Sequence, residues 1–254
     1  MTTLGIDIGS RNTKIVIFDP GQQKILFSGW SGTDVNPLVS LQRLLDEALR
    51  QTGSSSFAAT GCTGYGRKLY QQPARIVSEI SCHAAGVLFS HPEAKTIIDI
   101  GGQDSKIITL GEDGRVRDFV MNDKCAAGTG RFLEMTALRL ECPLEELSRL
   151  AEQATQEPRI SSTCVVFAET EIIGLIAQNE SAANIARAVH ESIAGRVLIQ
   201  LSSLEFHPPV VFTGGVAQNS DLANCLAQRL GMEIAVPPDP EITGALGAAL
   251  MVAR

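Results

Sequence analysis

The chain has 254 residues, which is longer than a typical single domain and predicts two domains of modest size. With 44% hydrophobic and 19% charged residues it can bury a core, which excludes a disordered or linker-like protein. Its net charge of −7, without any basic run, argues against a nucleic-acid partner, because binding to phosphate backbones depends on clustered Lys and Arg.

The first residues lead directly into an apolar strand, without a basic start or the apolar centre of a secretory signal. No run of about 18 apolar residues is present to span a membrane. We therefore expect a cytoplasmic protein, whose six cysteines are thiols or metal ligands rather than structural disulfides. No two of them form a C-x-x-C pair, and each by itself is first interpreted as a small buried hydrophobe.

The first predicted elements belong to a repeat of ten residues. Residues 6–15 read IDIGSRNTKI and residues 98–107 read IDIGGQDSKI, and the two align without a gap. In each copy a strand, a turn of small and polar residues and a second strand follow one another, as in a tight hairpin whose backbone N–H groups point inward. The four strands are expected at residues 4–8, 14–18, 96–100 and 106–110.

Helical patterns alternate with these hairpins. Asn36-Pro37 opens a helix with leucines along one face, and Gly53 closes it. After the second hairpin, Glu112-Asp113-Gly114 signals another turn that leads into a strand at 116–121. Amphipathic helices are expected after Cys125, Pro143, Cys164 and Ser181, late strands at 210–213 and 233–236, and a final helix at 243–253.

This order of elements predicts a duplicated α/β fold with mixed sheets, whose two halves face each other across a cleft. We place the boundary near Lys95. The first domain is expected at residues 1–94 together with a C-terminal helix at 241–254, and the second at residues 95–240.

The two repeated turns predict a clamp for one polyphosphate. Each turn presents backbone donors beside a strand-end carboxylate, Asp7 or Asp99. Because carboxylates repel phosphate, we expect them to hold a hydrated Mg²⁺, and Asp99 is a candidate for orienting the attacking water. An ordinary strand turn with a capping Asp would explain one copy, but two ungapped copies favour the clamp. The candidate nucleotide-binding residues of the turns are Gly9, Ser10, Arg11, Asn12, Thr13, Lys14, Gly101, Gly102, Gln103 and Asp104.

Near the C-terminus a buried strand ends in paired glycines, where backbone can lie against a flat ring. The candidates there are Gly214, Gly215, Val216 and Gln218. Together with the two clamps, this stretch resembles the adenosine motif of the actin, hexokinase and Hsp70 superfamily. The resemblance implies duplicated ribonuclease H-like domains around an ATP site, with connecting helices at residues 79–90 and 241–250.

Other stretches are more specific: GYGR at 64–67, NDKCAAGTGRF at 122–132, SSTCVVFAE at 161–169, and Gln103 where the chaperones carry a third glycine. Over essentially the whole chain these resemble the ATP-dependent activators of 2-hydroxyacyl-CoA dehydratases, relatives of the ATPase subunits of benzoyl-CoA reductase. The resemblance implies a homodimer with one [4Fe-4S] cluster between its subunits. It also implies that ATP drives delivery of one low-potential electron, taken from ferredoxin or flavodoxin, to a partner dehydratase or reductase.

The resemblance places Cys125 and Cys164 at the cluster ligand positions. Four thiolates normally hold such a cluster, and two per chain supply four only across a twofold axis. Each cysteine also precedes a predicted helix, at 126–140 and 165–178, whose N-terminus would stabilise a thiolate. The cysteine spacing by itself matches no common cluster or zinc pattern.

Three positions depart from the pattern that the family usually shows: Arg11 stands where a small hydroxyl residue is common, Ala85 where Arg is frequent, and Gln218 where Lys is frequent. His83 is expected in a connecting helix and His190 is interpreted as structural. The catalytic candidates are Asp99 and Gln103, the latter through the family resemblance.

Two alternatives stay open. A small-molecule kinase of the N-acetylhexosamine type could use the same fold, although no base or sugar pocket can be identified in the sequence. A nucleotide-binding regulatory or chaperone-like module is the other, and in it Cys125 and Cys164 would be redox-inert.

Overall fold

The computed structural model describes residues 1–54, 56–161 and 164–253. In this part of the chain each of two units is built on one mixed sheet of five strands. The first unit comprises Met1–Lys95, Leu110–Arg117 and Pro237–Arg254, and the second comprises Thr96–Thr109 and Asp118–Val236. No helix among the described residues has the length and apolar character needed to cross a membrane.

The first sheet has the strand order β3-β2-β1-β4-β5. Its strands are β1 (Thr3–Ile8), β2 (Asn12–Asp19), β3 (Lys24–Gly32), β4 (Ala59–Thr63) and β5 (Arg75–Ile76). The first three are antiparallel neighbours, whereas β4 runs parallel to β1 and β5 parallel to β4. All six residues of β1 are buried, because helices cover both faces of the sheet.

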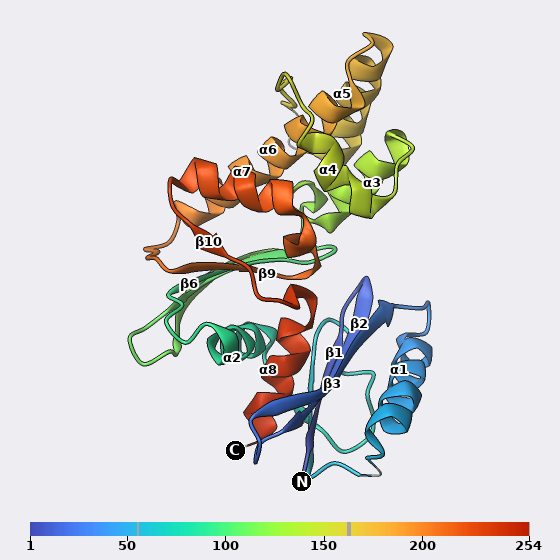
Figure 1. Cartoon of the computed structure of the whole chain (residues 1–254), viewed down its shortest axis with the longest axis vertical. Coiled ribbons are helices and arrows are strands. Elements are labelled where there is room, and N and C mark those ends of the chain that lie inside the picture. Colours follow the sequence, from blue (N-terminus) through green and yellow to red (C-terminus); the bar gives the residue numbers. More distant parts are fainter. Residues whose placement is uncertain (55, 162–163, 254) are drawn as a thin grey trace. The chain divides into compact units, whose positions relative to one another are not determined.

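Helix α1 (Pro37–Thr52) packs on β2 and β3, and helix α8 (Thr243–Val252) packs on β1, β2 and β4 (Figure 1). The predicted signals of α1 are confirmed: the Asn36 side chain accepts from the N–H of Leu38, and Gly53 ends the helix at a φ of 66°. Such a positive φ favours glycine.

Small residues let α8 approach both the sheet and helix α2 (Glu79–Ser90). A β-carbon on Gly5 would overlap the carbonyl oxygen of Ala245, and one on Gly247 would overlap that of Cys82. Backbone therefore lies against backbone on two sides of α8. Both helices predicted as connecting helices are present.

The second sheet has the order β10-β9-β6-β7-β8. Its strands are β6 (Thr96–Ile100), β7 (Ser105–Leu110), β8 (Val116–Asn122), β9 (Val210–Thr213) and β10 (Ile234–Ala235). The helices of this unit are α3 (Gly130–Arg139), α4 (Leu147–Ala151), α5 (Val165–Ala177), α6 (Ala182–Leu201) and α7 (Ser220–Leu230). Short 3₁₀ segments lie at Ala126–Gly128, Leu144–Glu146, Gly215–Gln218 and Pro240–Ile242, the last of these in the first unit.

The register of the strands confirms the duplication. Asp7 lies directly opposite Lys14 on the antiparallel strand and opposite Thr63 on the parallel strand. Asp99 occupies the same position in the second sheet, between Lys106 and Thr213. The predicted α/β fold with mixed sheets is thus confirmed, although β3, β4 and β5 were not predicted.

The prediction of a continuous helix at 126–140 is wrong at its N-terminal end. A 3₁₀ turn follows Cys125, and α3 begins only after Thr129, whose backbone is extended with φ −139° and ψ 171°. The Thr129 hydroxyl donates to the carbonyl of Ala126 at 2.8 Å and accepts from the N–H of Arg131. This local capping ends one turn and starts the next, so Cys125 precedes a 3₁₀ turn rather than an α-helix.

Candidate functional site

The first candidate phosphate turn joins β1 to β2. The N–H of Gly9 donates to the carbonyl of Asn12 at 3.1 Å, and the Thr33 hydroxyl donates to the carbonyl of Gly9 at 2.9 Å. Ser10 and Arg11 at the tip are exposed, whereas Thr13 is buried. A β-carbon at Gly9 would lie 2.6 Å from the Asn12 carbonyl oxygen, so the tight turn requires glycine here.

The second candidate turn, between β6 and β7, is built in the same way. The N–H of Gly101 donates to the carbonyl of Asp104 at 2.9 Å. Gln103 is exposed at the tip. The carbonyls of Gly101 and Gly102 face the start of α3 and accept from the N–H groups of Gly130 and Arg131, each at 2.9 Å.

Each strand-end carboxylate is held by the lysine of its own hairpin. The Lys14 Nζ lies 2.9 Å from Asp7 Oδ2, and the Lys106 Nζ lies 3.2 Å from Asp99 Oδ2 and 2.8 Å from Asp104 Oδ2. The second pair is the more deeply buried, with 1% of the Lys106 side chain and 2% of the Asp99 side chain exposed. Both carboxylates therefore have a cation beside them.

Sequence reasoning missed Lys106, although the signal was available. Each copy of the repeat places a lysine seven residues after its aspartate, and opposite residues of a short hairpin share one face of the sheet.

A glycine with positive φ lies against each carboxylate. In the first unit this is Gly64 at 89°, where a β-carbon would overlap Asp7 Oδ1. In the second it is Gly214 at 88°, where a β-carbon would lie 2.8 Å from Asp99 Oδ1. Each carboxylate is thus packed closely against the backbone of a glycine, where a side chain could not be accommodated. Gly64 was noted only for the family pattern, and its place opposite Asp7 was not predicted.

The other candidates for the adenosine motif follow β9. Gly215, Val216 and Gln218 form a 3₁₀ turn, and a β-carbon added to Gly215 would meet no atom of the described residues within 4 Å. Gln218 is exposed, whereas Val216 is largely buried. Open backbone at Gly215 fits a flat ring lying close to it.

The two candidate cluster cysteines both occupy N-cap positions. Cys164 is exposed at the N-cap of α5, and Cys125 is half-buried at the N-cap of the 3₁₀ turn. Ser162 and Thr163 of the same motif lie outside the described residues. In the described part of one chain, no three His, Cys, Asp or Glu side chains gather as a metal site.

Three of the remaining cysteines are core residues, as predicted. Cys62, Cys82 and Cys225 are buried. Burial raises the pKa of Cys62 to about 12 and that of Cys82 to about 12. Cys142 is half-buried, and burial raises its pKa as well. These thiols stay protonated at neutral pH, unlike the thiolates that ligate metals.

A buried polar network anchors the segment after the adenosine candidates. His190 Nδ1 lies 2.6 Å from Asp221 Oδ2, and its Nε2 lies 3.0 Å from the amide nitrogen of Asn219. Arg187 donates to the other Asp221 oxygen at 2.6 Å. Burial alone would raise the pKa of Asp221, but the hydrogen bonds and charges of His190 and Arg187 outweigh it and lower that pKa. His190 is thus a buried structural residue, as predicted.

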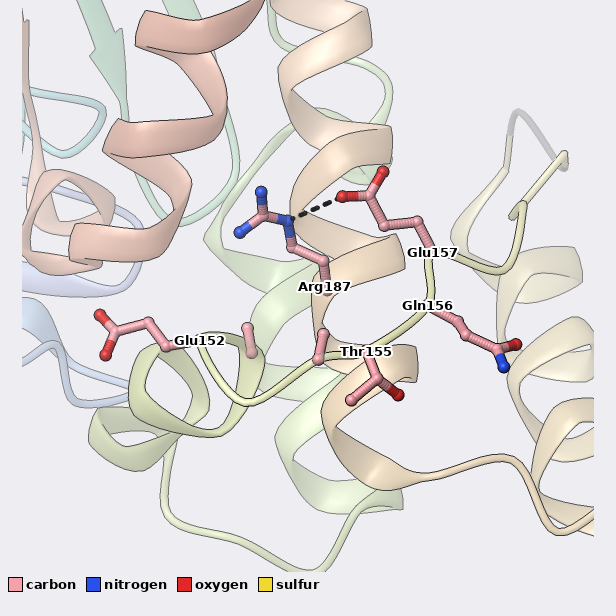
Figure 2. Close-up of a pocket in the computed structure, with 7 residues that line it drawn as sticks. Glu152, Thr155, Gln156, Glu157 and Arg187 are labelled. Atoms are coloured by element: carbon pink, nitrogen blue, oxygen red, sulfur yellow. Dashed lines mark ion pairs between the residues drawn. The ribbon is translucent and has the colours of Figure 1, made fainter.

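Arg187 also lines a surface pocket with Glu152, Thr155, Gln156 and Glu157, and its Nε lies 3.5 Å from a Glu157 oxygen (Figure 2). None of the predicted site residues lines this pocket. Because the guanidinium is already surrounded by carboxylates, the pocket offers no strong site for an anion.

The duplicated hairpins and the two mixed sheets place the chain in the actin-like ATPase fold class. The chain belongs to the BadF/BadG/BcrA/BcrD ATPase family, whose model matches residues 4–252. The predicted family resemblance is therefore confirmed.

The chain is 46% identical to the activator of lactoyl-CoA dehydratase from Anaerotignum propionicum, over 98% of this chain and 96% of the relative. It is also similar to the structure of the activator of the 2-hydroxyisocaproyl-CoA dehydratase from Clostridium difficile with bound ADPNP. There the TM-score is 0.94 and the identity 42%, over 100% of this chain and 94% of the other. A ROK family glucokinase from Streptomyces griseus, at 14% identity and a TM-score of 0.60, covering 99% of each chain, shares the fold alone.

Proposed function

We propose that this protein is an ATP-dependent activator of a 2-hydroxyacyl-CoA dehydratase or a related reductase, working in the cytoplasm. It would couple ATP binding and hydrolysis to the transfer of a single low-potential electron. Similarity to two dehydratase activators over almost the whole chain supports this proposal. The structural observation that carries it is that Cys125 and Cys164 both occupy N-cap positions, with Cys164 exposed, whereas Cys62, Cys82 and Cys225 are buried in the core.

The cluster would be shared by two copies of the chain. Cys125 and Cys164 from each subunit would provide four thiolates, and a [4Fe-4S] cluster bound there supplies one-electron chemistry at low potential. Exposed apolar side chains on α5 support a twofold interface beside Cys164, since Val166 and Phe167 are each 67% exposed. The N-terminus of α5 would favour the negative charge of the Cys164 thiolate.

The nucleotide would be bound by the two hairpin turns and the turn after β9. Backbone groups of Gly9–Lys14 and Gly101–Asp104 would hold the phosphates, and Gly214, Gly215, Val216 and Gln218 would lie at the adenosine. Asp7 and Asp99 would hold Mg²⁺ through water, and Asp99 and Gln103 would orient the attacking water. The equivalent positions of the two carboxylates, each at the end of the central strand beside its candidate turn, support this assignment.

ATP would act by shifting the chain between two states. Moving such an equilibrium from 1:99 to 99:1 needs about 5.5 kcal/mol of differential binding between ATP and ADP. Contacts of Gln103, Asp104 and the Ser10–Thr13 turn with the γ-phosphate would distinguish the two nucleotides, and Ser10, Arg11 and Gln103 are exposed at the tips of these turns. Hydrolysis would then reset the protein after the electron, received from ferredoxin or flavodoxin, has passed to the partner enzyme. Repeated turnover by Asp99→Asn without ATP hydrolysis would contradict this part of the proposal.

The decisive experiment measures iron, acid-labile sulfide and mass in solution for anaerobically purified protein. We expect about two irons per chain in a dimer. Cys125→Ser and Cys164→Ser should each abolish the iron, whereas Cys142→Ser, at a half-buried thiol outside the motif, should retain it. An iron-free monomer that still binds ATP would overturn the proposal. A phosphorylated sugar among the products would then identify a kinase, and its absence would leave a regulatory module.

A further inference from the structure

The start of α3 lies between the second candidate phosphate turn and the loop of Cys125. The backbone N–H groups of Gly130 and Arg131 both donate to this turn, at 2.9 Å to the carbonyls of Gly101 and Gly102. These are bonds between two segments far apart in the sequence, and both segments belong to the second unit. A displacement of the turn must therefore move the first residues of α3 or break both bonds.

Gly130 fits tightly against two nucleotide segments. A β-carbon at this position would lie 3.2 Å from the Gly101 carbonyl oxygen, 3.3 Å from the Gly102 Cα and 3.1 Å from Val216 Cγ2. Two of these neighbours are backbone atoms, which cannot move aside by changing a rotamer. Gly130 therefore packs against both the phosphate turn and the turn after β9, and a shift of either turn would displace it.

The connection from Gly130 back to Cys125 is short and is hydrogen-bonded at both ends. The buried Thr129 donates through its N–H and its hydroxyl to the carbonyl of Ala126, at 3.1 and 2.8 Å. The Asn122 side chain then accepts from the Cys125 N–H at 2.9 Å and donates to the Cys125 carbonyl at 2.7 Å. Because these bonds constrain both ends of the short segment, motion at Gly130 would be passed on to the cysteine.

We propose that Thr129 and Gly130 are positioning residues that couple the nucleotide to Cys125. This inference rests on the proposed function, since it assumes that the Gly101–Asp104 turn meets the nucleotide. It concerns binding and needs no cluster, because the coupling is built from hydrogen bonds within the protein.

The test measures the alkylation rate of Cys125 by mass spectrometry, in cluster-free protein with and without ADPNP. Cys164 in the same molecule is the internal reference. Allosteric coupling energies correspond to changes of about fivefold or more, so we expect ADPNP to change the Cys125 rate by at least this factor. Gly130→Ala should still bind ADPNP but lose the change. Gly128→Ala is the matched control, because its β-carbon would meet nothing closer than 3.7 Å among the described residues, and it should respond like wild type.

A second pair of variants tests the inference independently, in case Gly130→Ala does not fold. Thr129→Val keeps the shape but removes the hydroxyl bonds, so it should lose the ADPNP effect, and Thr129→Ser should restore it. A wild-type protein that binds ADPNP without any change at Cys125 would overturn the inference. So would Gly130→Ala and Thr129→Val proteins that respond fully. Failure of the protein to bind iron would overturn the proposed function instead. The alkylation result could still be interpreted, because it is measured on cluster-free protein.

Discussion

The two repeated hairpins allow the same substitution to be made at two equivalent positions of one protein, so that its effects on stability can be compared. We predict that Lys106→Met destabilises the fold clearly more than Lys14→Met does. Methionine keeps most of the lysine volume, so the main change is loss of the cation beside the carboxylate. In the second hairpin both partners are almost fully buried, with side-chain exposures of 1% and 2%, whereas 17% of the Lys14 side chain is exposed.

The magnitudes follow from this burial. Removing one partner of a buried ion pair costs about 3–5 kcal/mol, since the remaining charge stays in a poorly solvated place. Exposed pairs contribute about 0–1 kcal/mol, and the partly exposed Lys14 pair lies between these limits, at about 2 kcal/mol. The difference between the two variants should thus exceed about 1 kcal/mol.

Hydrogen exchange followed by mass spectrometry is the suitable assay, because a chain of two units need not unfold in one step. Lys106→Met should lower the protection of peptides from β6 and β7, and Lys14→Met that of peptides from β1 and β2. Lys124→Met, at an exposed surface pair, should change nothing measurable. Equal losses of protection in the two hairpins, or a larger loss in the first, would refute the reasoning from burial.

Three further predictions test other parts of the structure. Because the pKa of Asp221 lies below its ordinary value of 3.8, its charge stabilises the fold above about pH 4 and this contribution is lost as the pH falls through the folded-state pKa. The stability gap between wild type and Asp221→Asn, measured by urea unfolding, should therefore be full at pH 7 and shrink below pH 4; a gap independent of pH would contradict this. Gly247→Ala should cost about 1–3 kcal/mol or more, since its β-carbon overlaps the Cys82 carbonyl, whereas the helical Gly195→Ala, with 3.6 Å to its nearest neighbour, should be neutral or stabilising. Trp30, the single tryptophan, lies opposite the lysine of the first hairpin, so its emission should change when ADPNP binds; an unchanged spectrum at saturating ADPNP would place the nucleotide away from this hairpin.

Local signals in the sequence were sufficient for the hairpins, for α1 and for the family. The repeat at residues 6–15 and 98–107 predicts both hairpins because alternation and turn chemistry act over a few neighbouring residues. The caps at Asn36 and Gly53 work within one helical turn, so the bounds of α1 could also be predicted. Helix α3 shows the limit of this reasoning, since the hydroxyl of Thr129 competes with the helical pattern around it.

By itself, the sequence determined which residues form the two turns and which cysteines match the family motif, because these features are contiguous in the chain. The tertiary structure decided which groups stand beside them. It placed Gly64 against Asp7, Gly214 against Asp99, and Gly130 against Gly101. Such contacts depend on which strands pair and on where a distant helix begins, and these are set by burial of the whole sheet rather than by any local pattern.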